Sequence, residues 1–255
     1  LNVDVVMECT GAFNSKEKSM VHIEQGAKKG LLSAPGKTAD ATVVYGVNQE
    51  VLKASDLVVS NASCTTNCLA PLAKALHRTV GIERGLMTTV HSYTNDQVLT
   101  DVYHKDMRRA RAATLSMIPT KTGAAKAVGR VIPSLKGKMT GMAFRVPTAD
   151  VSVVDLTARL SKTASYADIC YEVKHASETY MKDIIGYTRD QVVSTDLIGN
   201  PCPCIFDETA GISLDQNFVK LIAWYDNEWG YSNMVVRMLE HMHTVDEADA
   251  FMAQE

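Results

Sequence analysis

The pattern of apolar positions divides the chain into two parts. In the first sixty residues, a dense apolar run over residues 1–10 stops at Thr10-Gly11, which predicts a buried strand followed by a loop. Residues 15–28 place Met20, Ile23 and Ala27 on one face of a helix. Three short apolar runs come next, at residues 31–34, 43–47 and 57–59. Strands that alternate with a helix predict the later part of a parallel α/β sheet.

After residue 60 the periodicity changes to longer elements. The pattern predicts two helices, over residues 65–78 and from about Thr122, and a third with its apolar face at residues 169–180. Strands are expected at residues 85–91, 138–146, 151–160, 204–206 and 218–225, and a last helix carries apolar residues at 235–242. Long strands grouped with helices predict an α+β domain with a mixed or antiparallel sheet. Residues 244–255 are polar and acidic, which predicts a loosely held tail.

Composition narrows the class of protein. The net charge of the 255 residues is -3, which gives no reason to expect a nucleic-acid or membrane partner. Apolar runs stay well below the roughly 20 residues that span a bilayer. The six cysteines are expected to be free thiols, and none has a histidine at metal-ligand spacing. We therefore predict a soluble protein without a metal site.

Cys64 is the candidate nucleophile. It follows an apolar strand and lies in a run of residues that favour helix caps, so it should stand at a helix N-terminus. Unpaired N–H groups and the helix dipole there favour the thiolate and should lower its pKa. The alternative is a small thiol buried beneath a helix, which suits Cys68 better because it lies inside the helix.

His91 is the candidate base, because it ends an apolar strand. In α/β folds the strand ends face the site, so a histidine there can meet a helix N-terminus. The alternative is a structural histidine whose ring is satisfied by its neighbours. His77 and His104 stand in charged surroundings and are expected at the surface.

Five motifs in sequence order carry a family resemblance. Residues 60–67, SNASCTTN, resemble the active-cysteine signature of phosphorylating glyceraldehyde-3-phosphate dehydrogenases, and residues 91–97, HSYTNDQ, resemble the base-histidine segment of that family. The other three matches are TGAAKAV at 122–128, FRVPT at 144–148 and WYDNEWGYSN at 224–233. The resemblance implies a Rossmann-type dinucleotide-binding domain followed by an α+β catalytic domain, acting in glycolysis.

The resemblance implies a covalent mechanism. Cys64 would attack the aldehyde of D-glyceraldehyde 3-phosphate, and His91 would take a proton as hydride leaves to the nicotinamide. Inorganic phosphate would then attack the thioester and release 1,3-bisphosphoglycerate. The Cys64 N–H and His91 would stabilise the oxyanion.

The resemblance also assigns phosphate-binding residues. Thr94, Asp96 and Arg145 would hold the phosphate of the substrate, since a guanidinium suits bidentate phosphate contact. Arg109 would lie between the two phosphate positions, although a solvated surface patch is the alternative for the basic run 108–111. The attacking phosphate would meet hydroxyls and N–H groups at two helix starts, namely those of Ser63, Thr65, Thr122 and Gly123.

For the cofactor, the resemblance assigns Thr10 and Gly11 to the adenine side of NAD and Asn227 and Tyr231 to the nicotinamide. Asn227 could alternatively cap a helix. The sequence has no Gly-x-Gly-x-x-Gly, and Val102-Tyr103 matches neither the usual NAD nor the NADP pattern, so NADP stays open. Met234 stands where the family usually has arginine.

The expected division is a partial NAD-binding domain (residues 1–63) without its N-terminal half, a catalytic domain (64–226), a helix returning to the NAD-binding domain (227–243) and a polar tail (244–255). As written, the chain is therefore expected to bind NAD poorly. The resemblance further implies a cytoplasmic homotetramer. The sister erythrose-4-phosphate dehydrogenase, a truncated non-catalytic binding paralogue and a thiol hydrolase built on Cys64 and His91 are the alternatives.

Overall fold

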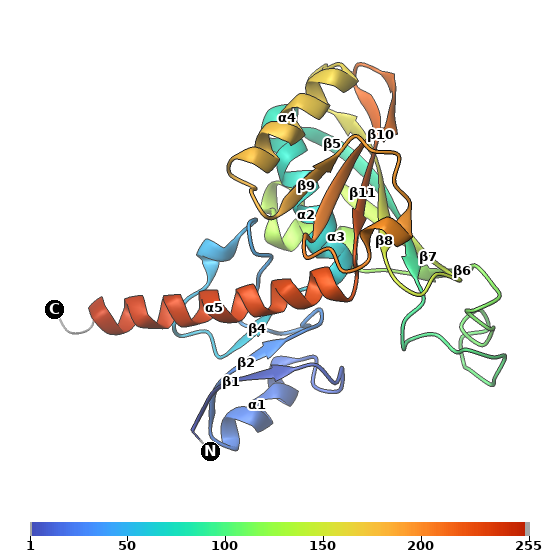
Figure 1. Ribbon diagram of the computed structural model, residues 1–255. Helices are drawn as coiled ribbons and strands as arrows, with labels where there is room; N and C mark the ends of the chain where they lie inside the picture. The colour runs from blue at the N-terminus through green and yellow to red at the C-terminus, as the bar shows by residue number, and fades with distance from the viewer. Residues whose placement is uncertain (1, 253–255) are drawn as a thin grey trace. The chain divides into compact units, whose positions relative to one another are not determined.

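A computed structural model describes residues 2–252 of the chain (Figure 1). The chain forms two compact units. One contains the residues up to Ser63 together with those from Ser232 onward, and the other is Cys64–Tyr231.

The first unit is built on a four-stranded parallel sheet in the order β1-β2-β4-β3. Its strands alternate with helical segments, as expected from the apolar runs, and the predicted parallel α/β sheet is confirmed. The elements in chain order are β1 (Val3–Glu8), α1 (Lys16–Glu24), β2 (Ala27–Leu32), β3 (Ala41–Thr42), the 3-10 turn η1 (Gln49–Val51) and β4 (Val58–Ser60).

Two elements of this unit differ from the prediction. The helix expected to reach residue 28 ends at Glu24, because Gly26 adopts a φ of 104° and β2 already begins at Ala27. The apolar run 43–47 is not a strand. Its backbone turns around the Asn48 side chain, which accepts from Val44 N at 2.9 Å and donates to the Thr42 carbonyl at 3.0 Å.

The last helix, α5 (Trp229–Met252), is longer than predicted. The polar tail expected at residues 244–255 is wrong for 244–252, which continue the helix, and residues 253–255 lie outside the described residues. Neither glycine nor proline occurs after Gly230 to stop the helix. Within the first unit, the Asp246 carboxylate pairs with Lys29, and His241 Nε2 contacts the Gln49 carbonyl at 3.0 Å.

The second unit contains a seven-stranded mixed sheet in the order β6-β7-β5-β8-β11-β10-β9. The expected mixed sheet is thus confirmed. Sequence patterns missed β6 and β9, which have four residues each and too few positions to show a period. The strands are β5 (Ile82–Ser92), β6 (Ile118–Lys121), β7 (Met139–Val146), β8 (Ser152–Leu160), β9 (Ile185–Thr188), β10 (Cys204–Asp215) and β11 (Phe218–Tyr225).

Helices cover one face of this sheet (Figure 1). They are α2 (Cys64–Thr79), α3 (Ala124–Val131) and α4 (Tyr166–Glu178), and two 3-10 turns, η2 (Pro133–Leu135) and η3 (Ser194–Leu197), lie in the connections. Leu69, Leu72 and Leu76 of α2 are almost fully buried in this core. At about 25 cal/mol per Å² of apolar surface, such burial is the main force holding α2 to the sheet.

Strand β5 links this core to polar residues at its C-terminal end. Met87 faces the helices, whereas Leu86, on the opposite face, is 65% exposed. At the end of the strand, His91 is buried and lies in register with Arg145 of the parallel neighbour β7. The pleat and register of the two strands therefore bring a base and a cation together.

Candidate active site

Cys64 begins helix α2 directly after a sharp turn from β4. Ala62, two residues earlier, is buried and has a φ of 55°, a conformation that non-glycine residues rarely adopt. The Cys64 Sγ lies 3.5 Å from His91 Nε2. The structure therefore brings together the two residues that sequence analysis selected as nucleophile and base, although they stand 27 positions apart.

The imidazole of His91 is held on several sides. Its Nδ1 lies 2.7 Å from the Ser92 carbonyl, and its ring meets the Tyr225 ring edge-to-face at 5.8 Å between centroids. The Tyr225 hydroxyl in turn contacts the hydroxyls of Thr65 and Thr89, at 2.8 Å each. These contacts fix the ring plane, so Nε2 points at the sulfur.

The tautomer of His91 follows from its neighbours. A carbonyl only accepts, so the 2.7 Å contact requires a proton on Nδ1, which leaves the Nε2 lone pair facing Cys64. Arg145 NH1 also lies 2.9 Å from Nδ1, but it cannot donate to a nitrogen that already carries hydrogen. Its hydrogen bond goes to the Ser92 carbonyl at 3.1 Å. In its neutral form His91 is thus a base toward the thiol.

The protonation equilibria differ from the sequence-based prediction. Burial raises the pKa of the Cys64 thiol above its ordinary value, and the charge of Arg145 and the Thr65 N–H oppose that shift without reversing it. The expected lowering of the Cys64 pKa is therefore wrong, because desolvation outweighs the charge of Arg145 and the hydrogen bonds of Thr65. Burial, assisted by Arg145, lowers the pKa of His91 to about 3. Burial thus shifts both pKa values in the direction that favours the uncharged forms of the two groups.

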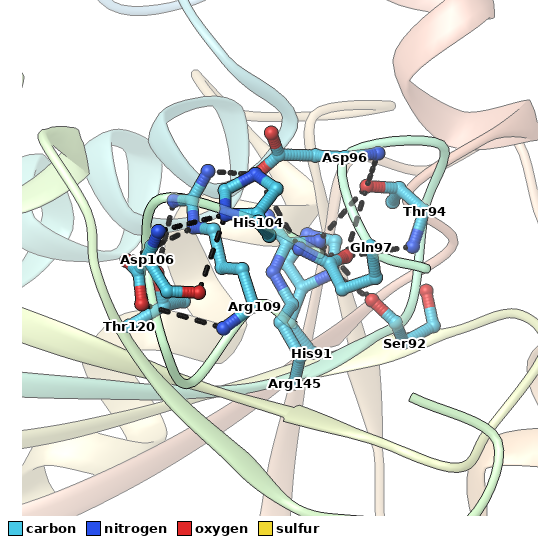
Figure 2. Close-up of polar contacts among 10 residues, drawn as sticks. All are labelled: His91, Ser92, Thr94, Asp96, Gln97, His104, Asp106, Arg109, Thr120 and Arg145. Atoms are coloured by element: carbon cyan, nitrogen blue, oxygen red, sulfur yellow. Dashed lines mark hydrogen bonds and ion pairs between the residues drawn. The ribbon is translucent and has the colours of Figure 1, made fainter. Parts of the chain in front are cut away.

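Arg145 connects this pair to the loop after β5 (Figure 2). Its NH1 also reaches Thr94 Oγ1 at 3.4 Å. Thr94 is held by Gln97, whose Oε1 accepts from the Thr94 backbone at 2.9 Å. Arg145 Nε is buried, and no described residue offers it a hydrogen bond. Gln97 was missed as a site residue, although its buried amide closes the turn that carries Thr94.

Arg109 forms a second cationic position. It pairs with Asp96 at 2.7 Å through NH1 and donates from NH2 to Thr120 Oγ1 at 2.9 Å (Figure 2). Gln97 Nε2 donates to the Asp96 carboxylate at 3.3 Å, so Asp96 links the two arginine positions. The surface-patch alternative does not fit Arg109, whose side chain is 26% exposed and doubly bonded, whereas Arg108 is exposed.

The predicted phosphate contacts at the two helix starts are only partly available. The Thr65 hydroxyl is buried against that of Tyr225, and both this hydroxyl and the Thr65 backbone N–H lie near the Cys64 sulfur and act to lower the pKa of its thiol. Ser63 is half-buried immediately before Cys64. At the other helix start, Thr122 Oγ1 accepts from Ala124 N at 3.2 Å, and Gly123 precedes α3 with an exposed backbone.

Asn227 is buried among hydroxyl groups. Its Oδ1 accepts from Ser92 Oγ at 2.8 Å and from Ser152 Oγ at 2.7 Å. Ser152 Oγ already accepts from Ser92 N, so its own hydrogen is free to bond Asn227. The amide Nδ2 therefore faces away from the serines, 3.3 Å from Glu228 Oε1.

The alternative role of Asn227 as a helix cap is not observed. Asp226 Oδ1 accepts from the backbone N of Glu228 and Trp229 instead, and thereby caps α5. Tyr231 lies half-buried in the first turn of that helix. Met234 is completely buried.

In the first unit, β1 ends at Glu8, whose carboxylate accepts from the Thr10 backbone at 2.8 Å. The next residue, Gly11, has a φ of 77°. This turn exposes Thr10 and Gly11 at the carboxyl end of a parallel strand, where α/β sheets bind ligands.

Other site types find little support in residues 2–252. There, no group of three or more histidine, cysteine or acidic side chains is arranged to hold a metal ion. All six cysteines are free. No helix within the described range is both long and apolar enough to cross a membrane.

Comparison with known proteins agrees with this arrangement. Residues 63–227 match the family described as "Glyceraldehyde 3-phosphate dehydrogenase, C-terminal domain". The plasmid-encoded glyceraldehyde-3-phosphate dehydrogenase of Cupriavidus necator is 58% identical over 241 residues, which are 94% of this chain and 70% of that protein. The glyceraldehyde-3-phosphate dehydrogenase 1 of Mucor circinelloides is 58% identical over 247 residues, 96% of this chain and 73% of the relative. The cytosolic enzyme of Nicotiana tabacum is 56% identical over 243 residues, 95% and 74% of the two chains. The chain therefore belongs to the glyceraldehyde-3-phosphate dehydrogenase family and is an oxidoreductase of that nicotinamide-dinucleotide-dependent class.

Proposed function

We propose that this chain carries out the phosphorylating oxidation of D-glyceraldehyde 3-phosphate to 1,3-bisphosphoglycerate in glycolysis, with Cys64 as nucleophile and His91 as base. One observation carries the proposal: Cys64 Sγ lies 3.5 Å from His91 Nε2, and the Ser92 carbonyl fixes the tautomer that leaves Nε2 free to accept a proton. High identity to dehydrogenases of this name supports it.

The first step forms a carbon–sulfur bond. His91 Nε2 accepts the proton of the Cys64 thiol, and the sulfur attacks the aldehyde carbon to give a hemithioacetal. The proton transfer makes a thiolate and an imidazolium. Because the two ions are close together, the attraction between them offsets the desolvation that disfavours each charge. The Cys64 N–H and the protonated His91 face the oxygen of the former carbonyl.

The second step oxidises the hemithioacetal. A bound nicotinamide supplies an acceptor for the hydride that leaves carbon. His91 first gives the thiol proton to the former carbonyl oxygen, which makes the hydroxyl, and takes that proton back at Nε2 as the carbonyl re-forms as a thioester on Cys64. Tyr225 and the Ser92 carbonyl keep the ring in place through both proton transfers.

The third step breaks the thioester. An oxygen of inorganic phosphate attacks the acyl carbon, and the carbon–sulfur bond breaks. The acyl phosphate is released, and the sulfur of Cys64 is left as a thiolate. We assign Thr94, Asp96 and Arg145 to the phosphate of the substrate, and Arg109 to the space between the two phosphates. Arg145 Nε supports this assignment because it is buried and lacks a protein acceptor among the described residues. The attacking phosphate is assigned to the N–H groups and hydroxyls of Ser63, Thr65, Thr122 and Gly123.

The residues fit a nicotinamide dinucleotide. Two serine hydroxyls fix the Asn227 oxygen, so the Nδ2 hydrogens can donate to the carboxamide oxygen of a nicotinamide. We assign Tyr231 to pack on its ring, and Thr10 and Gly11 to the adenine side. NAD is the proposed cofactor. Fluorescence titration of the protein with NAD and NADP in parallel tests this, and tighter binding of NADP would contradict it.

We also propose a homotetramer in the cytoplasm, in which residues 1–63 belong to the NAD-binding domain and 64–226 to the catalytic domain, and in which the helix expected at 227–243, observed as α5 (Trp229–Met252), belongs with the NAD-binding domain. The sheet of the second unit supports association, because its strands carry the exposed apolar side chains of Leu86, Val90 and Phe218. The description of a relative as cytosolic supports the location. Light scattering tests the assembly, and a monomer at micromolar concentration would contradict it.

A burst experiment tests the catalytic proposal. Without phosphate, the protein mixed with glyceraldehyde 3-phosphate and NAD should release about one equivalent of NADH per site and stop at the thioester. Cys64→Ser should give no burst. Comparing kcat/KM for erythrose 4-phosphate in the same assay distinguishes the sister activity, and a higher value for that substrate would overturn the triose assignment.

A further inference from the structure

A cavity of about 740 Å³ opens at the β6 edge of the seven-stranded sheet. It is separate from the nucleophile, since neither Cys64 nor His91 lines it. Its wall includes the Thr122-Gly123 turn and four cationic side chains, those of Arg108, Arg109, Lys121 and Lys126.

The charge in this cavity is strongly one-sided. Asp106 is its one carboxylate among the described lining residues, and it accepts from the backbone N of Arg108 and Arg109. Arg109 is engaged with Asp96 and Thr120. Lys121 and Lys126 are exposed, and within residues 2–252 neither forms an ion pair. Cations gathered in a concave wall focus the potential and attract anions.

Both lysines flank the turn assigned to the attacking phosphate. Lys121 ends β6, immediately before Thr122, and Lys126 stands in the first turn of α3. A cation at that helix start gains nothing from the helix dipole, which favours negative charge there. Its position is therefore better explained by an anion than by stabilisation of α3.

Arg109 joins the cavity to the catalytic residues. It lines the cavity and reaches Asp96, which Gln97 connects to the Thr94 turn beside Arg145 (Figure 2). Lys121, Lys126 and Arg109 all line the cavity, so a phosphate within it lies among these three cations. Arg145, to which the phosphate of the aldehyde is assigned, does not line this cavity.

We propose that this cavity is the access route for the phosphate that attacks the thioester, and that Lys121 and Lys126 recruit this dianion to the Thr122-Gly123 turn. The inference rests on the proposed function and extends it. The two lysines contribute to phosphate capture and not to the Cys64–His91 chemistry. The ligand chemistry is a phosphate dianion, either free or as the acyl-phosphate end of the product in the reverse direction.

The test is a pair of kinetic measurements on Lys121→Gln/Lys126→Gln. The KM for inorganic phosphate should rise about fivefold or more, while the KM for the aldehyde stays within twofold. Raising the salt concentration should increase the KM for phosphate more steeply in the unaltered protein than in the double variant, because screening removes what the lysines supply. Lys162→Gln is the matched control, since Lys162 is exposed and lines no part of this cavity.

Two results would overturn the inference: an unchanged KM for phosphate in the double variant, or an equal rise in the KM of phosphate and aldehyde. The phosphate-free NADH burst distinguishes failure of the access-route inference from failure of the proposed function. If the burst is present and the KM for phosphate is unchanged, only the access route is wrong. If the unaltered protein shows no burst at saturating NAD, the catalytic proposal itself fails.

The reverse reaction distinguishes the two phosphate sources. A rise confined to the KM for inorganic phosphate assigns the lysines to the free ion, whereas a parallel rise in the KM for 1,3-bisphosphoglycerate assigns them to both forms. Each outcome supports phosphate recruitment and shows which forms of phosphate the lysines recruit.

Discussion

The nucleophile site and the basic cavity handle charge in opposite ways. Around Cys64 the polar groups are buried and interlocked: His91 is held by the Ser92 carbonyl and Tyr225, and Arg145 by Ser92 and Thr94. In the cavity, Lys121 and Lys126 are exposed and form no ion pair among the described residues. One region fixes atoms in place, and the other leaves flexible cations in water.

This difference follows from what each region must do. Covalent chemistry needs the reacting atoms at defined distances, and an error of about 1 Å can cost roughly 100-fold in rate. Attracting a mobile anion needs only net charge in a concave surface, which does not depend on a single side-chain conformation. Substitutions in the first region should therefore have much larger effects than those in the second.

Replacing the nucleophile should give the largest effect. Cys64→Ser should lower kcat by at least about 10⁴-fold, because a serine hydroxyl is a far weaker nucleophile near neutral pH. Steady-state NADH formation measures this. Iodoacetate should also label Cys64 before the other five thiols, and earlier labelling of Cys202 or Cys204 would remove the assignment.

Removing the base should come next. His91→Asn should lower kcat by about 10²- to 10⁴-fold, the usual contribution of a positioned general base. It should also slow alkylation of Cys64 at neutral pH, since the thiol would lose its proton acceptor at 3.5 Å. Alkylation at the unaltered rate would show that His91 does not activate the sulfur.

A substitution of Arg145 tests whether the nucleophile site is more sensitive than the basic cavity. Arg145→Ala should lose about 1.5–3 kcal/mol in kcat/KM, the contribution of a charge-assisted hydrogen bond. The loss should shrink for unphosphorylated glyceraldehyde, which has no phosphate to hold. Equal losses on the two aldehydes would mean that Arg145 acts only by supporting the Ser92 carbonyl and the Thr94 turn.

The burial of His91 predicts a pH dependence of stability. Its pKa is about 3 in the folded protein against 6.5 in the unfolded chain, so between these values the unfolded state binds the extra proton. The stabilising contribution is present above pH 6.5 and is lost as pH falls toward 3, by at most about 1.4 kcal/mol per pH unit. Urea unfolding of the native protein and of His91→Asn measures it, and parallel stability curves from pH 7 to 4 would contradict it.

Cys68 should give the smallest effect on activity. It lies one turn after Cys64, fully buried, with Sγ at 3.9 Å from the Ala223 and Trp224 carbonyls. Cys68→Ala should leave kcat within about twofold and reduce the free energy of unfolding by about 1 kcal/mol through lost packing. A large fall in kcat without loss of stability would place Cys68 in the mechanism and weaken the distinction between core and site.

Much of the fold and site was already predictable from local pattern. The cap-forming residues around Cys64 predicted a helix start, and helix α2 does begin at that residue. The apolar run before His91 predicted a strand end. Family motifs then paired the two residues. The sequence pattern did not predict β6 and β9, because four residues are too few to show a period. It did not predict the extension of α5, because the polar last turns of this helix resemble a tail.

Only the tertiary structure decided the electrostatics. From sequence, the helix start of Cys64 suggested a lowered pKa, but the residues packed around this half-buried side chain desolvate the thiol, and desolvation raises the pKa instead. Likewise, the partnership of Arg109 with Asp96 and Thr120 depends on how a loop lies against β6. Local sequence specifies dipoles and caps, because these act within a turn or two. Desolvation and charge pairing depend on residues far apart in the chain, and folding alone brings those together.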